Sequence, residues 1–260
     1  MDSLSAAKSM RGSVGLLAMH WLMCQSTKDK AREAGMPDDN AGYAVGRFGV
    51  LGDCPVDNVV GAAFFWEPDY FRAQVNAGRS TMAPAEGGAI FARICQEWGA
   101  EQLDQFEGSD RLGELADKIV QAASPIGAPT FVGWRDQQLP ADGPGRTFQL
   151  VQTMRELGFA RHCTAVHAAG MRPVDAIMSG PTGAWNAKFF GWPEPYPDGE
   201  PLRDARKEIE AASNRLHAAD FEILSDDERE EFVTLAKAAR NHAGEKMKTS
   251  PGASASLPGG

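Results

Sequence analysis

Four titratable residues, Arg155, Glu156, Arg161 and His162, form the densest charged group beside apolar helical sequence. An arginine can hold a carboxylate or a phosphate through two parallel hydrogen bonds, while a neighbouring glutamate or histidine moves a proton. The other interpretation is a salt-bridge network at a helix end, with Gly158 terminating the helix. Both interpretations stay open from the sequence, and the first makes Arg155, Glu156 and His162 candidate ligand-binding residues.

A single arginine, Arg47, lies in a segment of small and apolar residues, GYAVGRFGVLG. The glycines Gly46, Gly49 and Gly52 are spaced G-x-x-G-x-x-G, which matches neither the dinucleotide-binding nor the P-loop pattern. A guanidinium buried without a partner is very costly, so Arg47 either pairs with an internal carboxylate or faces an anionic ligand. Glycines on one helical face would also let a neighbouring helix or a ligand approach the backbone closely.

His20 and Cys24 are spaced i and i+4, which would place them on one helical face and suits a soft metal ion. Two ligands are too few to predict a metal site, and a hydrogen-bonded buried histidine explains the pair equally well. We expect His20 and His162 to lie in one cavity with Arg47. His167 is five positions after His162 and should face away from it.

Helices must position these side chains, because amphipathic helical patterns dominate the chain. We predict a mainly α fold of two packed helical halves, residues 1–130 and 145–243, with a helix-turn-helix-like portion and little or no β-structure. The boundary is predicted from residues 124–145, which hold four prolines and four glycines. The first helix is expected over about 5–34, a second over 42–51, and a disordered tail over 244–260.

The composition describes a soluble globular chain of 260 residues with a net charge of −9. Acidic charge opposes the positive field that phosphate contacts require, so nucleic acid is disfavoured as a partner. The four cysteines form no C-x-x-C pair, which favours a reducing cytoplasm. The apolar run VGLLAMHWLMC has 11 residues, far short of the roughly 20 that span a bilayer. No membrane association is therefore expected.

Several segments carry a resemblance to a known family: LLAMH (16–20), AGM (34–36), GYAVGRFGVLG (42–52), VVGAAFFWEP (59–68) and RELGFARHCTAVHAAGM (155–171). With them the chain resembles an actinobacterial family of helix-turn-helix-like helical proteins, whose members are mostly hypothetical proteins. The resemblance implies a mainly helical fold with a helix-turn-helix or winged-helix-like portion. It also implies histidines at His20 and His162 and an arginine at Arg47. Typical members carry a winged-helix-like insertion before the final helices, where this chain has the shorter WPEPYPDGEP.

Two functions remain after these observations. The first is a small-molecule-binding helical protein, with or without enzymatic activity, whose polar site (His20, Arg47, Arg155, Glu156 and His162) lies inside an apolar helical pocket. The alternative is a DNA-binding transcription regulator of helix-turn-helix type. The acidic charge, the shortened wing and the absence of a helix with clustered Lys and Arg count against the regulator. The ligand, any reaction and any metal or haem cofactor stay open, and a homodimer is admitted as an assembly.

Overall fold

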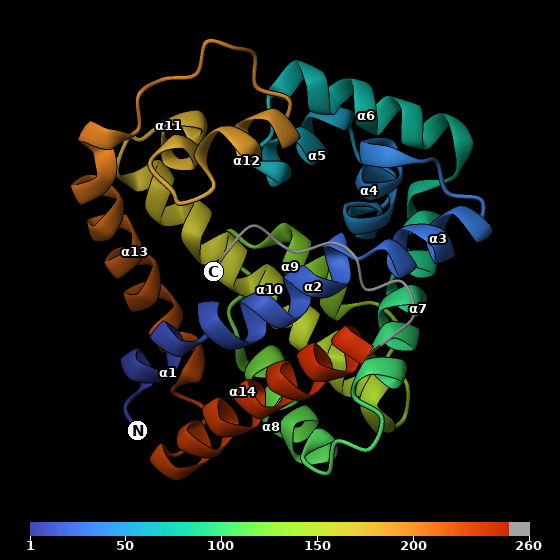
Figure 1. The fold of residues 1–260 in the computed structure, drawn as a ribbon, viewed down its shortest axis with the longest axis vertical. Coiled ribbons are helices and arrows are strands. Elements are labelled where there is room, and N and C mark those ends of the chain that lie inside the picture. The colour runs from blue at the N-terminus through green and yellow to red at the C-terminus, as the bar shows by residue number, and fades with distance from the viewer. Residues whose placement is uncertain (250–260) are drawn as a thin grey trace.

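The computed structural model describes residues 1–249 and builds them almost entirely from helices, with no strand in that part of the chain (Figure 1). The predicted mainly α fold is confirmed. The α-helices are α1 Ser3–Ser9, α2 Leu16–Met23, α3 Gln25–Glu33, α4 Asp39–Arg47, α5 Val56–Ala63, α6 Pro68–Thr81, α7 Pro84–Gln102, α8 Ser109–Ala122, α9 Pro129–Arg135, α10 Gly143–Ala168, α11 Pro173–Met178, α12 Gly183–Phe189, α13 Arg203–Ala218 and α14 Asp226–Thr249. None of the helices in this range is long and apolar enough to cross a membrane.

The first forty residues do not form the single helix that was predicted over 5–34. A π-helical turn, Arg11–Gly15, separates α1 from α2. Cys24 then adopts an extended backbone (φ −73°, ψ 152°) between α2 and α3. Its thiol contacts the Trp21 carbonyl at 3.3 Å and the Thr27 hydroxyl at 3.1 Å, which fixes this break. His20 and Cys24 therefore do not share one continuous helical face.

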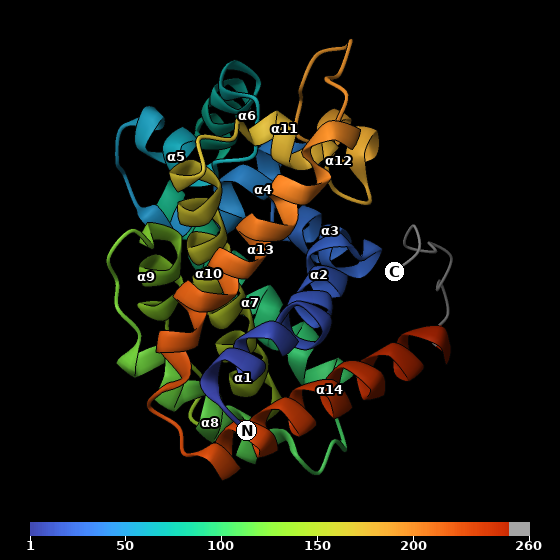
Figure 2. The same ribbon diagram turned by 90° about the vertical axis from the view of Figure 1, so that its left-hand side faces the viewer.

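Helix α10 is the centre of the molecule and packs against α7, α8, α9 and α13 (Figures 1 and 2). A helix end at Gly158 was one of the two interpretations of the titratable group, and it is wrong, since α10 continues to Ala168. A Cβ at Gly158 would lie 3.5 Å from Nε2 of His217, so the glycine leaves room for the end of α13. Arg155 and Glu156 consequently project from the middle of a long helix.

One large hydrophobic core contains side chains from the first helix to the last. Its largest members are the fully buried rings of Trp21, Trp98, Trp134 and Phe148, which come from α2, α7, α9 and α10. Trp98 and Phe148 lie 4.5 Å apart between centroids, a favourable aromatic distance. Because α7 and α10 both contribute to this core, the predicted division at 124–145 places a boundary between elements that share it. The two halves stay a prediction.

Gly42, Gly46 and Gly49 make close contacts, as the sequence predicts, whereas Gly52 does not. A Cβ at Gly49 would lie 2.3 Å from the Pro84 carbonyl oxygen, and one at Gly46 would lie 2.8 Å from the Phe91 ring. The expected continuous helix over 42–51 is wrong, because α4 ends at Arg47 and a 3₁₀ turn follows over Gly49–Leu51. The absent side chains allow α7 to pack directly against this turn.

Helix α14 begins with a capping box formed by Ser225 and Glu228. The Ser225 hydroxyl accepts a hydrogen bond from the Glu228 amide at 3.2 Å, and the Glu228 carboxylate accepts one from the Ser225 amide at 3.0 Å. The helix continues to Thr249, six positions into the segment 244–260 that was predicted to be disordered. The rest of that predicted tail lies outside the described residues.

Candidate functional site

Arg47 ends α4 with a side chain that is only 3% exposed. Its Nε and Nη2 donate to the two carboxylate oxygens of Glu156 at 2.9 and 2.8 Å. Its Nη1 donates to the Tyr43 hydroxyl at 2.6 Å, and the rings of Phe48 and Phe159 lie 4.7 and 4.8 Å from the guanidinium carbon. Every nitrogen of this guanidinium therefore has an acceptor inside the protein. The internal carboxylate is the alternative that the structure realises.

Glu156 on α10 is fully buried and joins further donors to the pair. Arg155 Nη1 and Gln152 Nε2 both donate to its Oε1, at 2.7 and 2.8 Å. Burial alone would favour the neutral acid, but Arg47 and Arg155 outweigh it and hold the pKa of Glu156 below its usual value. The same pairing raises the pKa of Arg47 against the effect of its burial. We name Arg47, Glu156 and Arg155 the Arg47 cluster.

His162 lies six residues after Glu156 on α10, nearly two helical turns beyond the Arg47 cluster. Its Nδ1 is 2.9 Å from the Ser213 hydroxyl, and its ring stacks on Phe65 with centroids 5.7 Å apart. Phe65 in turn contacts Phe159, which lies against Arg47 and Arg155. Burial, reinforced by the positive charge of Arg206, lowers the pKa of His162 to about 4. His162 is connected to the cluster through aromatic rings. Among the described residues, no hydrogen bond joins it to the cluster.

His20 is not joined to the Arg47 cluster by any hydrogen bond, ion pair or ring contact of the described residues. Burial and the charge of Arg240 on α14 lower its pKa, and its Nδ1 is buried without a partner. Within residues 1–249, no group of three or more His, Cys, Asp and Glu side chains is placed to hold a metal ion. Five residues were predicted to form one site. Arg47, Arg155 and Glu156 contact one another, and His162 lies beside them through aromatic rings. His20 is not connected to them by any contact of the described residues.

Acidification from pH 7 to pH 5 is expected to lower the free energy of unfolding by about 1–2 kcal/mol through His162. Its folded pKa of about 4 lies below the ordinary histidine pKa of 6.5. Since the unfolded chain takes up the proton first, this stabilisation is complete above pH 6.5 and is lost as the pH falls toward 4. Urea unfolding at both pH values should show a weaker pH dependence in His162→Gln. His167→Gln, an exposed histidine of the same helix, should keep the wild-type dependence; identical behaviour of both variants would contradict the assignment.

A second structural feature, which the sequence analysis did not single out, is a three-helix unit formed by α4, α5 and α6 (residues 39–81). It has a hydrophobic cluster of its own, made of Ala44, Phe48, Val59, Ala63, Trp66, Phe71 and Val75. A turn of four residues, 64–67, joins α5 to α6, and Phe64 takes a positive φ of 49° there. Glu67 accepts a hydrogen bond from the Tyr70 amide at 2.6 Å and so caps α6. A short turn between two helices is one feature of a helix-turn-helix.

The segment after α12 holds this turn in place. Trp192 Nε1 donates to the Phe65 carbonyl at 2.8 Å, and the Phe190 carbonyl accepts from the Glu67 amide at 2.9 Å. The rings of Phe189 and Phe190 pack on Trp66 with centroids 5.3 and 5.1 Å away. The aromatic residues around 185–196 thus cover the turn of the three-helix unit. Residues 190–199 form no helix or strand, and so no wing.

Helix α6 presents one face to solvent at the edge of the molecule (Figures 1 and 2). Ala73, Asn76, Ala77 and Ser80 are exposed and follow the i, i+3, i+4, i+7 spacing of a single helical face. The opposite face, which includes Phe71, Val75 and Gly78, is buried against α4 and α5. These four residues are the α6 face. Its side chains are short, so another molecule can approach the helix backbone.

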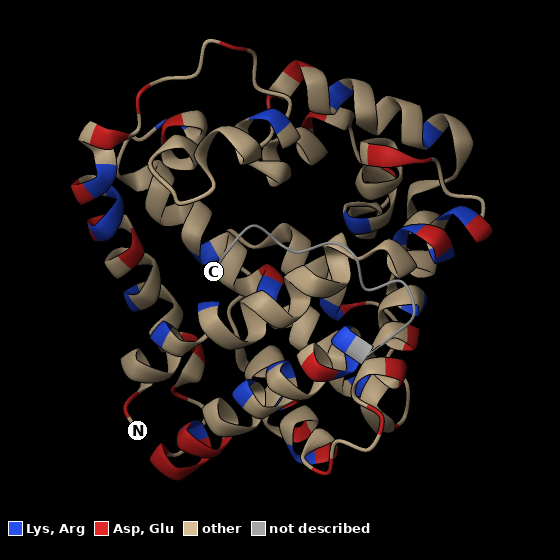
Figure 3. Cartoon of the chain, in the orientation of Figure 1, with Lys and Arg blue, Asp and Glu red and all other residues tan. Residues whose placement is uncertain are grey.

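The charges around the α6 face are mixed (Figure 3). Arg72 lies at its edge with a side chain 40% exposed, and it pairs with Asp57 at 2.9 Å and with Asp69. Arg79 donates to the Cys54 carbonyl at 2.7 Å. Both arginines are near the surface of α6, and their present partners are exposed carboxylates or a carbonyl. Exposed ion pairs of this kind contribute little to stability.

Within residues 1–249 the fold is all-helical, and α5 and α6 are joined by a tight turn that leaves one face of α6 exposed. A family model described as a helix-turn-helix family matches residues 7–248, and the chain belongs to this family. No curated protein and no solved structure matches the chain. The family match extends over all the segments on which the resemblance was based.

Membership in this family overturns one prediction. Nucleic acid was disfavoured as a partner because the net charge is −9, yet the helix-turn-helix family to which the chain belongs points to nucleic-acid binding. Net charge was the wrong measure, since a recognition helix needs favourable contacts only over its own exposed face. The prediction of a disfavoured nucleic acid is withdrawn.

Proposed function

We propose that this protein binds double-stranded DNA and that α6 is its recognition helix. The observation that carries the proposal is the α6 face itself, an exposed stripe of short side chains on the second helix of a helix-turn-helix with its own core. A helix held in this way enters the major groove, where its outward side chains meet base edges. Family membership supports the same function.

The side-chain types of the α6 face suit contacts with base pairs. Asn76 can donate to and accept from the edge of one adenine, the pairing for which asparagine is best suited. Ala73 and Ala77 flank it and can contact thymine methyl groups without holding the helix away from the groove. Arg72 can turn from Asp57 and Asp69 to a phosphate or a guanine, since its side chain is 40% exposed. The face as a whole favours A·T pairs at its centre.

The acidic surroundings of α6 set the expected strength of phosphate binding. Asp57 and Asp69 both pair with Arg72, so few phosphates can be neutralised by one protein molecule. Each neutralised phosphate contributes about −0.9 to the slope of log K against log salt concentration. With two arginines the slope should be about −2 per protein molecule. Base contacts then carry a larger share of the affinity than phosphate contacts do.

The proposal is tested by selecting sequences from a random DNA library with the purified protein at low salt. We expect enrichment of sites with an A·T-rich centre and a salt slope near −2, measured by fluorescence anisotropy on the selected duplex. Binding of all sequences with equal affinity, or recovery of the unselected library, would contradict the proposal. A slope near −2 requires only about two neutralised phosphates, so a protein with a net negative charge can give this result.

A small-molecule site at the Arg47 cluster is the weaker candidate. The guanidinium of Arg47 has an internal acceptor on each nitrogen, and Glu156 accepts four hydrogen bonds. A ligand anion would have to displace Glu156 from a pair with almost no exposure to water, which is costly. The scattered cysteines predict a cytoplasmic location, and we propose this location for the DNA-binding protein as well.

A further inference from the structure

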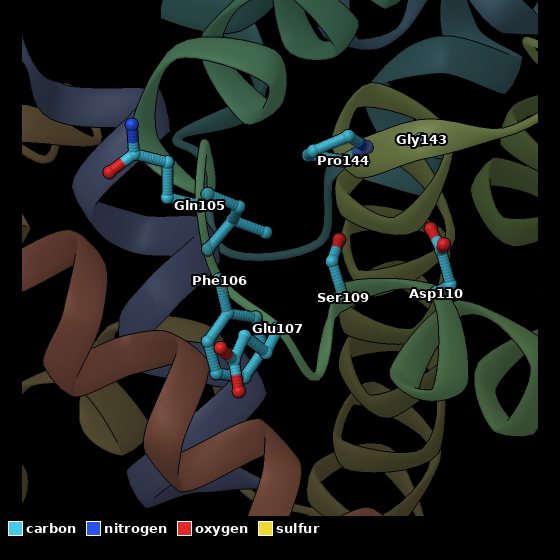
Figure 4. A pocket seen from close by; sticks show the side chains of 8 residues that line it. Gln105, Phe106, Glu107, Ser109, Asp110, Gly143 and Pro144 are labelled. Atoms are coloured by element: carbon cyan, nitrogen blue, oxygen red, sulfur yellow. The ribbon is translucent and has the colours of Figure 1, made fainter.

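A hollow of about 320 Å³ lies where the connection between α7 and α8 meets the start of α10. This end of the molecule is opposite to α6 in both views (Figures 1 and 2). The lining residues are Leu103, Gln105, Phe106 and Glu107 from the connection, Ser109 and Asp110 from α8, and Gly143 and Pro144 from α10 (Figure 4). None of them belongs to the Arg47 cluster or to the three-helix unit.

Ser109 provides an unpaired polar group in the wall of this hollow. The residue is only 5% exposed, and its hydroxyl is buried without a hydrogen-bond partner in the protein. Figure 4 shows the hydroxyl directed toward Pro144, across the hollow from Phe106. Gly108 is the N-cap residue of α8, so the Ser109 hydroxyl does not cap this helix and stays without a partner. A buried hydroxyl without a partner is unfavourable, so a bound polar atom would relieve this cost.

Two long helices begin side by side at this place. Thr147 of α10 donates to the Ser109 carbonyl at 2.9 Å, and a Cβ at Gly113 would lie 2.6 Å from the Thr147 hydroxyl oxygen. The caps of α8 and α10, Gly108 and Asp142, make no side-chain hydrogen bond to the helix amides. The Ser109 amide donates to the Phe106 carbonyl at 2.9 Å and Pro144 has no N–H, but the other first-turn amides have no partner within their own helix, and each helix start carries about half a positive charge. Together with the Ser109 hydroxyl they form a place for a carboxylate.

The same hollow is also lined by two carboxylates, which favour a positively charged group. The Asp110 carboxylate points toward Gly143 and Pro144 beside the Ser109 hydroxyl, and Glu107 lies in the connection (Figure 4). A doubly charged inorganic anion would be repelled by these carboxylates, whereas an ammonium group would be attracted. Leu103, Phe106 and Pro144 supply an apolar wall. The hollow therefore combines a carboxylate position, an ammonium position and an apolar surface.

We propose that this hollow binds a free α-amino acid with an apolar side chain. The carboxylate of the ligand accepts hydrogen bonds from the Ser109 hydroxyl and from first-turn amides of α8 and α10. Its ammonium group pairs with Asp110, and its side chain packs on Leu103, Phe106 and Pro144. The proposal is independent of DNA binding, because α6 and the hollow share no residue.

The test is titration of the purified full chain with leucine, valine, methionine and phenylalanine, followed by ligand-observed NMR and calorimetry. We expect saturable binding of at least one of the four. The deaminated and the decarboxylated analogue of the best binder, for leucine 4-methylpentanoate and 3-methylbutylamine, should each bind at least tenfold more weakly. Absence of binding by all four amino acids, or equal binding of either analogue, would overturn the proposal.

Two variants locate the binding in the hollow. Ser109→Ala should weaken binding about tenfold without lowering the melting temperature, because it removes an unpaired buried hydroxyl. Asp110→Asn should weaken it by a similar factor. Glu86→Gln, an exposed acidic position at the start of α7, should bind as the wild type does. Unchanged affinity in Ser109→Ala, or equal loss in Glu86→Gln, would show that the amino acid binds elsewhere and would refute the assignment.

Discussion

Replacing Glu156 by leucine should destabilise the protein by about 3–5 kcal/mol, the cost typical of breaking a buried ion pair by removing one partner. The change leaves the guanidinium of Arg47 with a side-chain exposure of 3% and no counter-charge. Gln152 and Arg155 lose the same acceptor. Water cannot replace the carboxylate at a site this deeply buried, so the penalty is not offset by hydration. Chemical denaturation of the two proteins measures the difference.

Two further variants separate the ion pair from simple loss of packing. Arg47→Met together with Glu156→Leu removes both charges at similar volume, and most of the lost stability should return. Glu101→Leu changes an exposed glutamate that pairs with Lys30 on the surface, with 51% of its side chain exposed. It should alter stability by no more than about 0.5 kcal/mol. If Glu156→Leu were no worse than Glu101→Leu, the Arg47 cluster would have no role in stability.

The sequence predicts helices well where apolar periodicity and a start signal coincide. Pro68 begins α6, and the Ser225 and Glu228 capping box begins α14, as their patterns indicate. Breaks within helical sequence are harder to predict. Cys24 interrupts the first segment, where its thiol contacts neighbouring polar groups, whereas α10 continues through Gly158 despite the weak helix propensity of glycine.

The candidate site could be predicted only in part. Burial cost alone requires a partner for Arg47, but its carboxylate, on Glu156, lies 109 residues away in the chain. Local spacing contains no information about a pairing over that distance. His20 was grouped with Arg47 by residue type, and residue type does not specify which side of α2 faces which neighbour. The sequence predicts a helix-turn-helix-like portion, which the family match supports, but it does not locate that portion, since no helix has clustered Lys and Arg residues.

Introducing two glutamates on the α6 face, Ala73→Glu with Ala77→Glu, should reduce the affinity for selected DNA at least a hundredfold. Each new carboxylate would lie against the phosphates and base edges of the groove, and like charges at such an interface cost several kcal/mol. Both alanines are exposed in the free protein, so the fold should tolerate the change. Circular dichroism and thermal unfolding should match the wild type.

Recognition by α6 is tested most directly by fluorescence anisotropy of this double variant on the selected duplex, beside Ala205→Glu as a control at an exposed position of α13. The account predicts loss of binding in the α6 variant and wild-type affinity in the control. Wild-type affinity in both proteins, with both still folded, would contradict the assignment of α6 as the recognition helix.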